Sequence, residues 1–156
     1  MTIQNDFEIV VLDSNAVADL EKISTLFGKA FKDPETYSSK CPSAIYLKSL
    51  LESDTFIALA ARLGGKMVGG LIAYELKKFE QERSEIYIYD LAVDEEHRRK
   101  RIATALIDYL NRLAISRNAW VVYVQADHED TPAIELYSKM GKRGDVLHFD
   151  IKPEKA

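Results

Sequence analysis

The sequence is poor in the residues that define several special classes of protein. Its 156 residues include one cysteine, Cys41, which excludes an intramolecular disulfide and a metal site built from several thiolates. No apolar run approaches the roughly 20 residues that a membrane-spanning helix needs. The first residues also lack the basic region, apolar stretch and small-residue cleavage site of a secretion signal. We therefore expect a cytoplasmic protein that does not act at a membrane.

Neither sign of charge is in large excess. Lys and Arg total 21 and Asp and Glu total 25, so the formal net charge is -4. This acidic balance does not favour a nucleic acid as partner. The three histidines, His97, His128 and His148, lack the spacing of metal ligands, and we expect no metal site. The length suits a single domain over residues 1–156.

Hydrophobic periodicity and turn residues predict an alternation of strands and helices. Gly64-Gly65 between two apolar runs is a strong signal for a β-hairpin. The chain should begin with a strand at 7–12, a helix that is capped by Ser14 or Asn15 and ends near Phe31, a polar connection at 32–43 and a helix capped by Ser43. We then expect hairpin strands at 55–63 and 66–76, followed by a strand at 84–93. The remaining elements are a helix with apolar residues from Ile102 to Leu113, a strand at 119–126, a helix at 131–140 and a closing strand near 145–151. This order predicts a mixed α/β domain in which a three-strand meander leads into a crossover helix.

A run of four cations stands where one of these helices should begin. Residues 98–101 read Arg-Arg-Lys-Arg, and positive charge in a first helical turn opposes the helix dipole by roughly 0.3–1 kcal/mol per exposed residue. The acidic neighbours Asp94, Glu95 and Glu96 could neutralise the run within a solvated turn. A nucleic-acid patch is a second interpretation, which the acidic chain disfavours. The third is a bound anion whose phosphate oxygens accept from free N–H groups at the helix start and from the arginines.

Two segments resemble a known family. Residues 98–103, Arg-Arg-Lys-Arg-Ile-Ala, resemble the acetyl-coenzyme A motif of the GNAT N-acetyltransferases, Gln/Arg-x-x-Gly-x-Gly/Ala, with Arg101 in the usual glycine position. An arginine with helical backbone angles would keep its N–H available there. The segment "DTPAIELYSKMG" resembles a later element of the same superfamily through Asp130, Ala133, Tyr137 and Gly141. Phenylalanine often follows that glycine, whereas here Lys142 follows it.

From Phe27 onward, nearly the whole chain resembles the aminoglycoside 3-N-acetyltransferases of type I. The most specific segment is "SEIYIYDLAV", residues 84–93, whose Tyr-Asp pair is unusual for the superfamily. The resemblance implies a GNAT-like single α/β domain with a central mixed, mostly antiparallel twisted sheet flanked by helices. It also implies acetyl-CoA as co-substrate, a gentamicin-like aminoglycoside as acceptor, direct transfer in a ternary complex, a homodimer and a role in bacterial antibiotic resistance.

The resemblance assigns roles to particular residues. It makes Asp90 the first candidate for the general base, with Glu85 as the alternative, and Tyr137 the acid that protonates the departing thiolate. The residues expected to hold the coenzyme are Leu91, Ala92 and Val93 through their backbone groups, followed by Arg98, Arg99, Lys100, Arg101, Ile102, Ala103, Thr104, Asp130, Ala133 and Tyr137.

Strand parity raises a question about Asp90. In a regular strand Asp90 would share a face with the apolar Ile86 and Ile88, whereas Glu85 would share one with Tyr87. A carboxylate on an apolar face is costly without a partner or a wet cleft. Either a β-bulge re-aims the strand at Asp90, or Asp90 lies at the open end of the sheet.

An aminoglycoside is a polycation, so its pocket should be rich in carboxylates with some aromatic surface. The candidates on predicted loops are Asp33, Glu35, Tyr37, Glu80, Glu82, Asp127 and Glu129. Two alternatives stay open. One is an acetyltransferase for another small amine or polyamine, and the other is a non-catalytic module that binds acyl-CoA.

Overall fold

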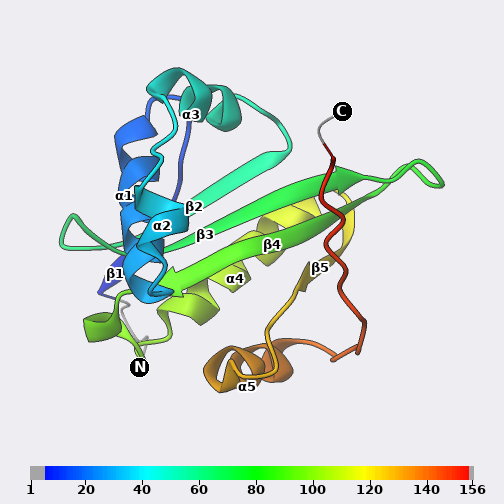
Figure 1. Ribbon diagram of the computed structural model, residues 1–156. Helices are drawn as coiled ribbons and strands as arrows, with labels where there is room; N and C mark the ends of the chain where they lie inside the picture. The colour runs from blue at the N-terminus through cyan, green and yellow to red at the C-terminus, as the bar shows by residue number, and fades with distance from the viewer. Residues whose placement is uncertain (1–5, 155–156) are drawn as a thin grey trace. The chain divides into compact units, whose positions relative to one another are not determined.

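The structure, a computed structural model, describes residues 6–154 and divides them into two compact units (Figure 1). One unit ends at Gln125 and the other begins at Ala126. The first unit contains β1 (Phe7–Val11), α1 (Val17–Ala30), α2 (Pro34–Ser38), α3 (Ala44–Leu51), β2 (Phe56–Leu63), β3 (Lys66–Lys77), β4 (Ser84–Val93), a 3-10 turn (Glu95–His97), α4 (Ile102–Ser116) and β5 (Ala119–Val124). The second contains α5 (Thr131–Met140). Within the described range, no helix has both the length and the apolar character needed to cross a membrane.

The strands of the first unit form one mixed sheet in the order β1-β2-β3-β4-β5. The first four strands pair antiparallel, and β5 pairs parallel to β4. Parallel neighbours cannot be joined by a tight turn, so α4 crosses over between them. The Gly64-Gly65 turn joins β2 to β3, with φ of 55° and 81° at the two glycines, as the sequence predicts. The predicted α/β class and the mostly antiparallel sheet flanked by helices are confirmed.

Helices cover both faces of the sheet, as two adjacent glycines in β3 demonstrate. A Cβ atom at Gly70 would lie 3.1 Å from Ile23 of α1, and one at Gly69 would lie 3.2 Å from Ile102 of α4. Successive residues of a strand face opposite sides, so α1 and α4 cover opposite faces. Figure 1 accordingly shows α4 behind the sheet and α1 in front of it. The two glycines allow both helices to approach the sheet closely.

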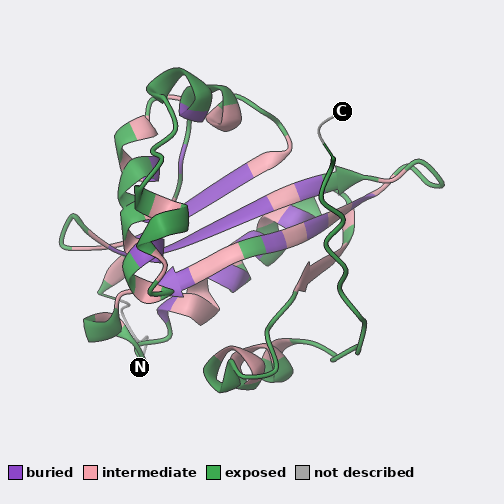
Figure 2. Ribbon diagram, viewed as in Figure 1, coloured by how far each residue is buried: buried purple, intermediate pink, exposed green. Residues whose placement is uncertain are grey.

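The core lies along the central strands, which Figure 2 shows mostly in purple. Leu59 and Ala60 of β2 have no exposed surface. On one face of the sheet, Ala60 belongs to the same buried cluster as Phe27 of α1. On the other face, Leu106 and Leu110 of α4 are buried. Burial of this apolar surface is the main stabilising contribution to the sheet and its helices.

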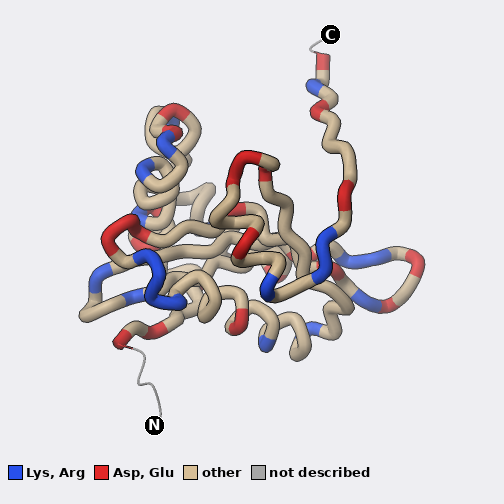
Figure 3. The backbone as a smooth tube through the Cα atoms, turned by 90° about the horizontal axis from the view of Figure 1, so that it is seen from below, with Lys and Arg blue, Asp and Glu red and all other residues tan. Residues whose placement is uncertain are grey.

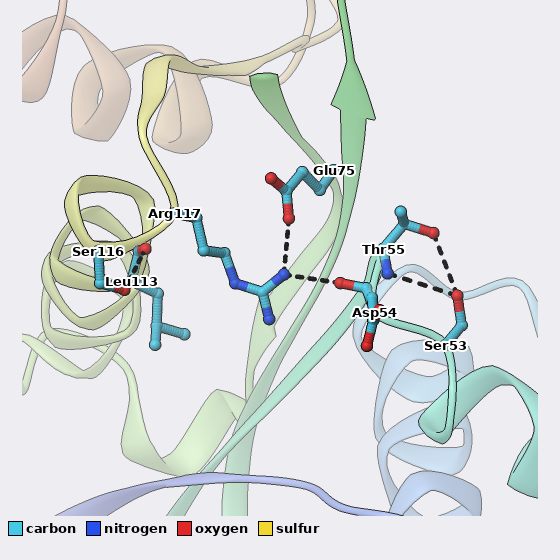
Figure 4. A network of polar contacts seen from close by, with 7 residues as sticks. All are labelled: Ser53, Asp54, Thr55, Glu75, Leu113, Ser116 and Arg117. Atoms are coloured by element: carbon cyan, nitrogen blue, oxygen red, sulfur yellow. Dashed lines mark hydrogen bonds and ion pairs between the residues drawn. The ribbon is translucent and has the colours of Figure 1, made fainter. Parts of the chain in front are cut away.

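Arg117 anchors the far end of α4. Its Nη1 donates to the backbone oxygen of Asp54 and to Oε2 of Glu75, both at 2.6 Å (Figure 4). The Glu75 side chain is 8% exposed, and a carboxylate buried to that extent needs a partner. The pair therefore fixes the carboxyl end of α4 against β2 and β3.

Two predicted details of the helices before β2 are wrong. α1 begins after Ala16, and neither Ser14 nor Asn15 caps it, because the N–H of Asn15 turns back to the Asp13 carboxylate at 2.8 Å. The connection at 32–43 is not a loop throughout, since it contains α2. The predicted cap at Ser43 is confirmed, because its hydroxyl accepts from the N–H of Tyr46 at 3.2 Å.

The closing strand predicted near 145–151 is also wrong. Those residues have no regular secondary structure. An alternating apolar pattern does not supply the neighbouring strand whose N–H and C=O groups a β-strand requires. The second unit therefore has α5 as the one regular element among its described residues.

Candidate active site

A β-bulge in β4 answers the question of parity. Ile72 of β3 pairs with Asp90, but the next residue, Ala73, pairs with Ile88, which leaves Tyr89 without an opposite residue. One extra residue reverses the alternation of side chains beyond it. Asp90 therefore faces the same side as Tyr87, on which α1 lies, and not the side of Ile88. The bulge is confirmed as one of the two arrangements expected from the sequence.

The Asp90 carboxylate receives a hydrogen bond from Tyr37. The Tyr37 hydroxyl lies 2.7 Å from Asp90 Oδ1. α2 places Tyr37, and this helix begins where the Asp33 carboxylate accepts from the N–H of Thr36 at 3.1 Å. The Tyr37 backbone oxygen accepts from the Ser24 hydroxyl at 2.8 Å. Tyr37 is thus held by its neighbours on α1 and fixes the orientation of Asp90.

The tyrosine ring is fixed by packing as well. Its centroid lies 5.9 Å from that of Phe27 and 5.6 Å from that of Phe31. Burial raises the pKa of Tyr37, and its hydrogen bond to Asp90 and nearby negative charge add to the rise. The Tyr37 hydroxyl therefore keeps its proton and remains a donor to Asp90.

The environment of Asp90 suits a proton acceptor. Burial raises the pKa of this carboxyl, and the hydrogen bond from Tyr37 lowers it in part. A general base works best when its pKa approaches the working pH. No ion pair within residues 6–154 involves Asp90. Its charge is therefore available to a cationic substrate.

Glu85 has a different environment. Its Oε1 lies 3.3 Å from Nζ of Lys78 and accepts a hydrogen bond from Nε1 of Trp120 at 3.3 Å. Lys78 also lies 3.4 Å from the Glu80 carboxylate. The ammonium of Lys78 and the indole N–H both engage the Glu85 carboxylate, whereas no ion pair within residues 6–154 engages Asp90. The geometry thus favours Asp90 over Glu85 as the base.

β4 and β5 part beyond the bulge. Their pairing runs from Ser84 and Ala119 to Ile88 and Val124. Leu91, Ala92 and Val93 pair with β3 on one side, and within the described chain no strand pairs with them on the other. The backbone oxygen of Val93 accepts from Nε of Arg98 at 3.4 Å, and the remaining backbone groups along that edge need partners. An extended ligand with its own amide groups could supply them, as expected for these three residues.

The cationic loop before α4 is built from unusual backbone conformations. Arg98 is extended, whereas Arg99 and Arg101 have φ of 61° and 62°. Arg101 is the residue before α4 and lies in the left-handed region, not in the right-handed helical conformation expected from the sequence. Glycine adopts left-handed angles freely, whereas other L-residues are strained in them. This explains why the motif has glycine at that position.

Backbone donors at the start of α4 are unpartnered. No side chain caps the helix, and within residues 6–154 no backbone acceptor is found for the N–H groups of Ile102, Ala103 and Thr104. The first intrahelical acceptor, Arg101, receives the N–H of Ala105 at 3.0 Å. Three N–H groups beside four cations make a site of the kind that binds phosphate.

The acidic turn does not neutralise the cations. Asp94 caps the 3-10 turn through the N–H of Glu96 at 3.3 Å and lies 3.9 Å from Lys66 and 3.8 Å from His97. No ion pair in the described part of the chain joins Asp94, Glu95 or Glu96 to residues 98–101. Figure 3 shows the cations as a continuous blue run after the red turn. The neutralised turn is therefore the weaker interpretation.

The second unit contains the remaining coenzyme candidates. The Asp130 carboxylate caps α5 by accepting from the N–H of Ala133 at 3.2 Å. Burial raises the pKa of the Tyr137 hydroxyl to about 12, and the Asp130 charge acts in the same direction. Tyr137 therefore keeps its proton at neutral pH, as an acid must. The roles of these three residues stay predictions.

The candidates for binding the acceptor are scattered. Asp33, Glu35 and Tyr37 belong to α2, and Tyr37 contacts Asp90. Glu80 and Glu82 lie in the β3–β4 turn before Ser84, at the opposite end of β4 from the bulge. Asp127 and Glu129 lie in the second unit.

Sequence reasoning missed three tyrosines on the sheet, Tyr74, Tyr89 and Tyr123. Their only signal in the sequence is the recurrence of tyrosine in the strands. No group of His, Cys, Asp and Glu among the described residues could hold a metal ion.

Solved structures resemble this chain over nearly its full length. An aminoglycoside acetyltransferase from an uncultured soil metagenomic sample is 58% identical, and the match covers 95% of this chain and 99% of that one with a TM-score of 0.93. Another from an uncultured soil metagenomic sample, in complex with sisomicin, is 30% identical over 97% of this chain and 99% of that one, with a TM-score of 0.90.

A curated relative and a family model agree with these structures. An uncharacterized N-acetyltransferase of Methanocaldococcus jannaschii is 28% identical over 127 residues, which are 79% of this chain and 56% of that protein. This chain thus spans little more than half of that relative's length. The model of the acetyltransferase (GNAT) family matches residues 20–142, which include the bulge in β4, the cationic loop and α5. The chain therefore belongs to the acetyltransferase (GNAT) family.

Proposed function

We propose that this protein transfers the acetyl group of acetyl-CoA to the 3-amino group of a 2-deoxystreptamine aminoglycoside of the gentamicin type. The observation that carries the proposal is the bulge that places the Asp90 carboxylate where β4 and β5 part. The acceptor class is supported by the similarity to two aminoglycoside acetyltransferases, one of them in complex with sisomicin. The 3-amino position rests on the resemblance of residues 84–93.

The residues of the chain fit acetyl-CoA. The N–H groups of Ile102, Ala103 and Thr104, with the cations of residues 98–101, match the charge of the pyrophosphate. The open edge of β4 at residues 91–93 matches the amide groups of the pantetheine arm. When bound, acetyl-CoA supplies the acetyl group as a thioester.

Proton movements define the roles of the side chains. An amine attacks only as the neutral base, so Asp90 takes one proton from it, directly or through water, while Tyr37 holds the carboxylate in place. Tyr137 gives a proton to the departing sulfur, and the second proton that the nitrogen loses as the amide forms passes through solvent and restores the tyrosine hydroxyl. Transfer is direct within a ternary complex, and no side chain carries the acetyl group. The carboxylates of Asp33, Glu35, Glu80, Glu82, Asp127 and Glu129 attract the polycation.

The test measures CoA release and the site of acetylation. With acetyl-CoA and sisomicin, we expect one free thiol per drug molecule and an acetyl group on N3 by NMR. Turnover of spermidine without turnover of either sisomicin or gentamicin would identify the protein as another amine acetyltransferase. Tight binding of acetyl-CoA in calorimetry with no transfer to any amine would identify a binding module.

We also propose that the protein acts as a cytoplasmic homodimer, that residues 1–156 work as one domain, and that acetylation protects a bacterial cell from the drug. The resemblance of the sequence supports the homodimer and the protective role, the single cysteine suits the cytoplasm, and the length suits one domain. Light scattering should give twice the chain mass of 17.7 kDa. Expression in a susceptible strain should raise the inhibitory concentration of gentamicin, and a variant Asp90→Asn should not.

A further inference from the structure

A continuous row of aromatic rings crosses the sheet on the face that carries Asp90. The members of this aromatic row, in spatial order, are Phe56 of β2, Tyr74 of β3, Tyr89 and Tyr87 of β4, and Tyr123 of β5. Consecutive ring centroids lie 5.6, 5.8, 5.6 and 4.8 Å apart. The first three pairs meet edge to face, and the last pair is stacked with an interplanar angle of 4°.

Strand register explains why the rings share one face. Phe56 is opposite Tyr74, Tyr74 is opposite Tyr87, and Tyr87 is opposite Tyr123. Tyr89 is the extra residue of the bulge, and its ring fills the gap between Tyr74 and Tyr87. Cross-strand aromatic pairs stabilise a sheet. Sheet stability is thus one role of the row.

The exposure of Tyr89 calls for a second role. Its side chain is 61% exposed, whereas the other members of the row are half-buried. The hydrophobic cluster on this face packs α1 and α3 against the sheet and reaches Phe56 and Tyr74, but it does not include Tyr87 or Tyr89. A large aromatic side chain left open beside Asp90 presents its ring to a ligand.

The row is flanked by carboxylates. Asp90 follows Tyr89 directly, and its charge contributes, after burial, to the raised pKa of both Tyr74 and Tyr87. Glu85 has the corresponding effect on the pKa of Tyr123 at the other end, where its partner Lys78 acts in the opposite direction. Aromatic faces carry negative potential and attract ammonium groups, and they also pack against apolar ring faces. The surface therefore suits a ligand that has both rings and several positive charges.

We propose that the aromatic row binds the acceptor, a cyclic polyamine sugar, with Tyr89 and Tyr87 against its ring faces and ammonium groups. Tyr89 then positions the reacting amine beside the neighbouring Asp90. This inference rests on the proposed function in naming the acceptor class. It adds an aromatic binding surface to the carboxylates expected from the sequence.

The test measures the affinity for sisomicin by calorimetry in four proteins. The variants are Tyr89→Leu, Tyr89→Phe and the matched control Tyr109→Leu, which removes a half-buried tyrosine from α4 on the opposite face. Cation–π contacts are worth roughly 0.5–2 kcal/mol, so Tyr89→Leu should weaken sisomicin binding about 2-fold to 30-fold. Tyr89→Phe keeps the ring and should bind as the parent does. Tyr109→Leu should leave affinity unchanged, and all four proteins should bind CoA equally.

Two further ligands separate the chemistry that the row recognises. Spermidine carries the charges without sugar rings, and trehalose carries sugar rings without charge. We expect both to bind more weakly than sisomicin and to lose less affinity on Tyr89→Leu. If Tyr89→Leu lowered the affinity for spermidine more than that for sisomicin, recognition of sugar ring faces would be overturned. If it lowered the affinity for trehalose more than that for sisomicin, recognition of charge would be overturned.

The same measurements separate failure of the inference from failure of the proposed function. If sisomicin is acetylated but Tyr89→Leu changes neither its Kd nor its KM, the aromatic row is not the binding surface. If sisomicin binds with the expected dependence on Tyr89 but receives no acetyl group, the row binds a polyamine sugar and the proposed reaction is wrong.

Discussion

The surroundings of Asp90 and the loop of residues 98–101 differ in how far intramolecular contacts complete them. Asp90 has a hydrogen bond from a packed tyrosine, antiparallel pairing to β3 and aromatic neighbours. The loop has two arginines in left-handed conformations, exposed side chains and a helix start with unpartnered N–H groups. The two regions are joined directly, because β4 ends at Val93 and α4 begins at Ile102.

This difference has a functional consequence. A site that performs proton transfer must hold its groups in one geometry before the substrate arrives. A site that holds a highly charged ligand can leave its donors open, because the ligand provides the missing acceptors and stabilises the folded state by mass action. We therefore expect substitutions near Asp90 to alter catalysis and substitutions in the loop to alter coenzyme affinity and stability.

The largest effect is expected from Asp90→Asn. The amide retains the shape of the side chain but does not accept a proton at neutral pH, so kcat should fall by roughly 10²–10⁴-fold. The Kd of acetyl-CoA should stay within a factor of about two, since the loop is untouched. Steady-state kinetics and calorimetry measure the two quantities. A larger fall in kcat for Glu85→Gln than for Asp90→Asn would exchange their roles.

Tyr137→Phe is expected to have the next largest effect. A thiolate leaves more readily than most groups, so loss of its proton donor should lower kcat by about 10-fold to 100-fold, at the low end of acid catalysis. The pKa of about 12 means that Tyr137 loses its proton only as pH rises toward that value. The parent enzyme should therefore show no loss of activity from this group between pH 7 and about 10. An unchanged kcat in the variant at every pH would exclude Tyr137 as the acid.

Tyr37→Phe should change the dependence of activity on pH. Asp90 acts as a base only when ionised, and the hydrogen bond from Tyr37 stabilises the ionised form and lowers its pKa. Removal of the hydroxyl should raise the pKa of Asp90, so the acid limb of kcat/KM should move to higher pH. Activity on the acid side should fall by up to about tenfold, the scale of one hydrogen bond to a charged group, and recover as pH rises.

A control separates this effect from loss of packing around the ring. Ser24→Ala removes the hydrogen bond to the Tyr37 backbone oxygen and leaves the phenol in place. It should lower stability slightly without moving the acid limb. An acid limb that stays in place in Tyr37→Phe would show that the hydroxyl does not act on Asp90.

Local sequence patterns predicted the elements that frame the site. The Gly64-Gly65 hairpin, the strand at 84–93 and the helix from Ile102 each follow from periodicity within a short window, and the structure has all three. The sequence predicted the bulge only as one of two alternatives, the other being a position of Asp90 at the open end of the sheet. The choice depends on the register between β4 and β3, which is not a local property of the sequence. The closing strand near 145–151 failed for a similar reason, since pairing depends on a distant partner.

Contacts over long sequence separations were beyond the reach of those patterns. The sequence predicted Tyr37 on a loop, as a substrate ligand. In the structure Asp33 caps α2, and this helix brings the Tyr37 hydroxyl to Asp90, which is 53 residues away in the sequence. The aromatic row draws on four strands, so no single window of the sequence reveals it. In contrast, the sequence alone shows that Arg101 stands where the motif has glycine. It does not show that the backbone of Arg101 is left-handed.

Arg101→Gly is expected to have the smallest effect and tests the loop alone. A left-handed conformation costs a non-glycine residue roughly 1–2 kcal/mol, and glycine loses more entropy on folding, so the net gain in unfolding free energy should be about 0.5–1 kcal/mol. Arg99→Gly is the matched control, because Arg99 has nearly the same φ but occupies a variable position of the motif. Both variants should unfold at higher urea concentration, and Arg101→Gly should bind CoA at least as tightly as the parent. A large loss of CoA affinity in Arg101→Gly alone would show that this side chain grips a phosphate, so that its charge outweighs the strain of its backbone.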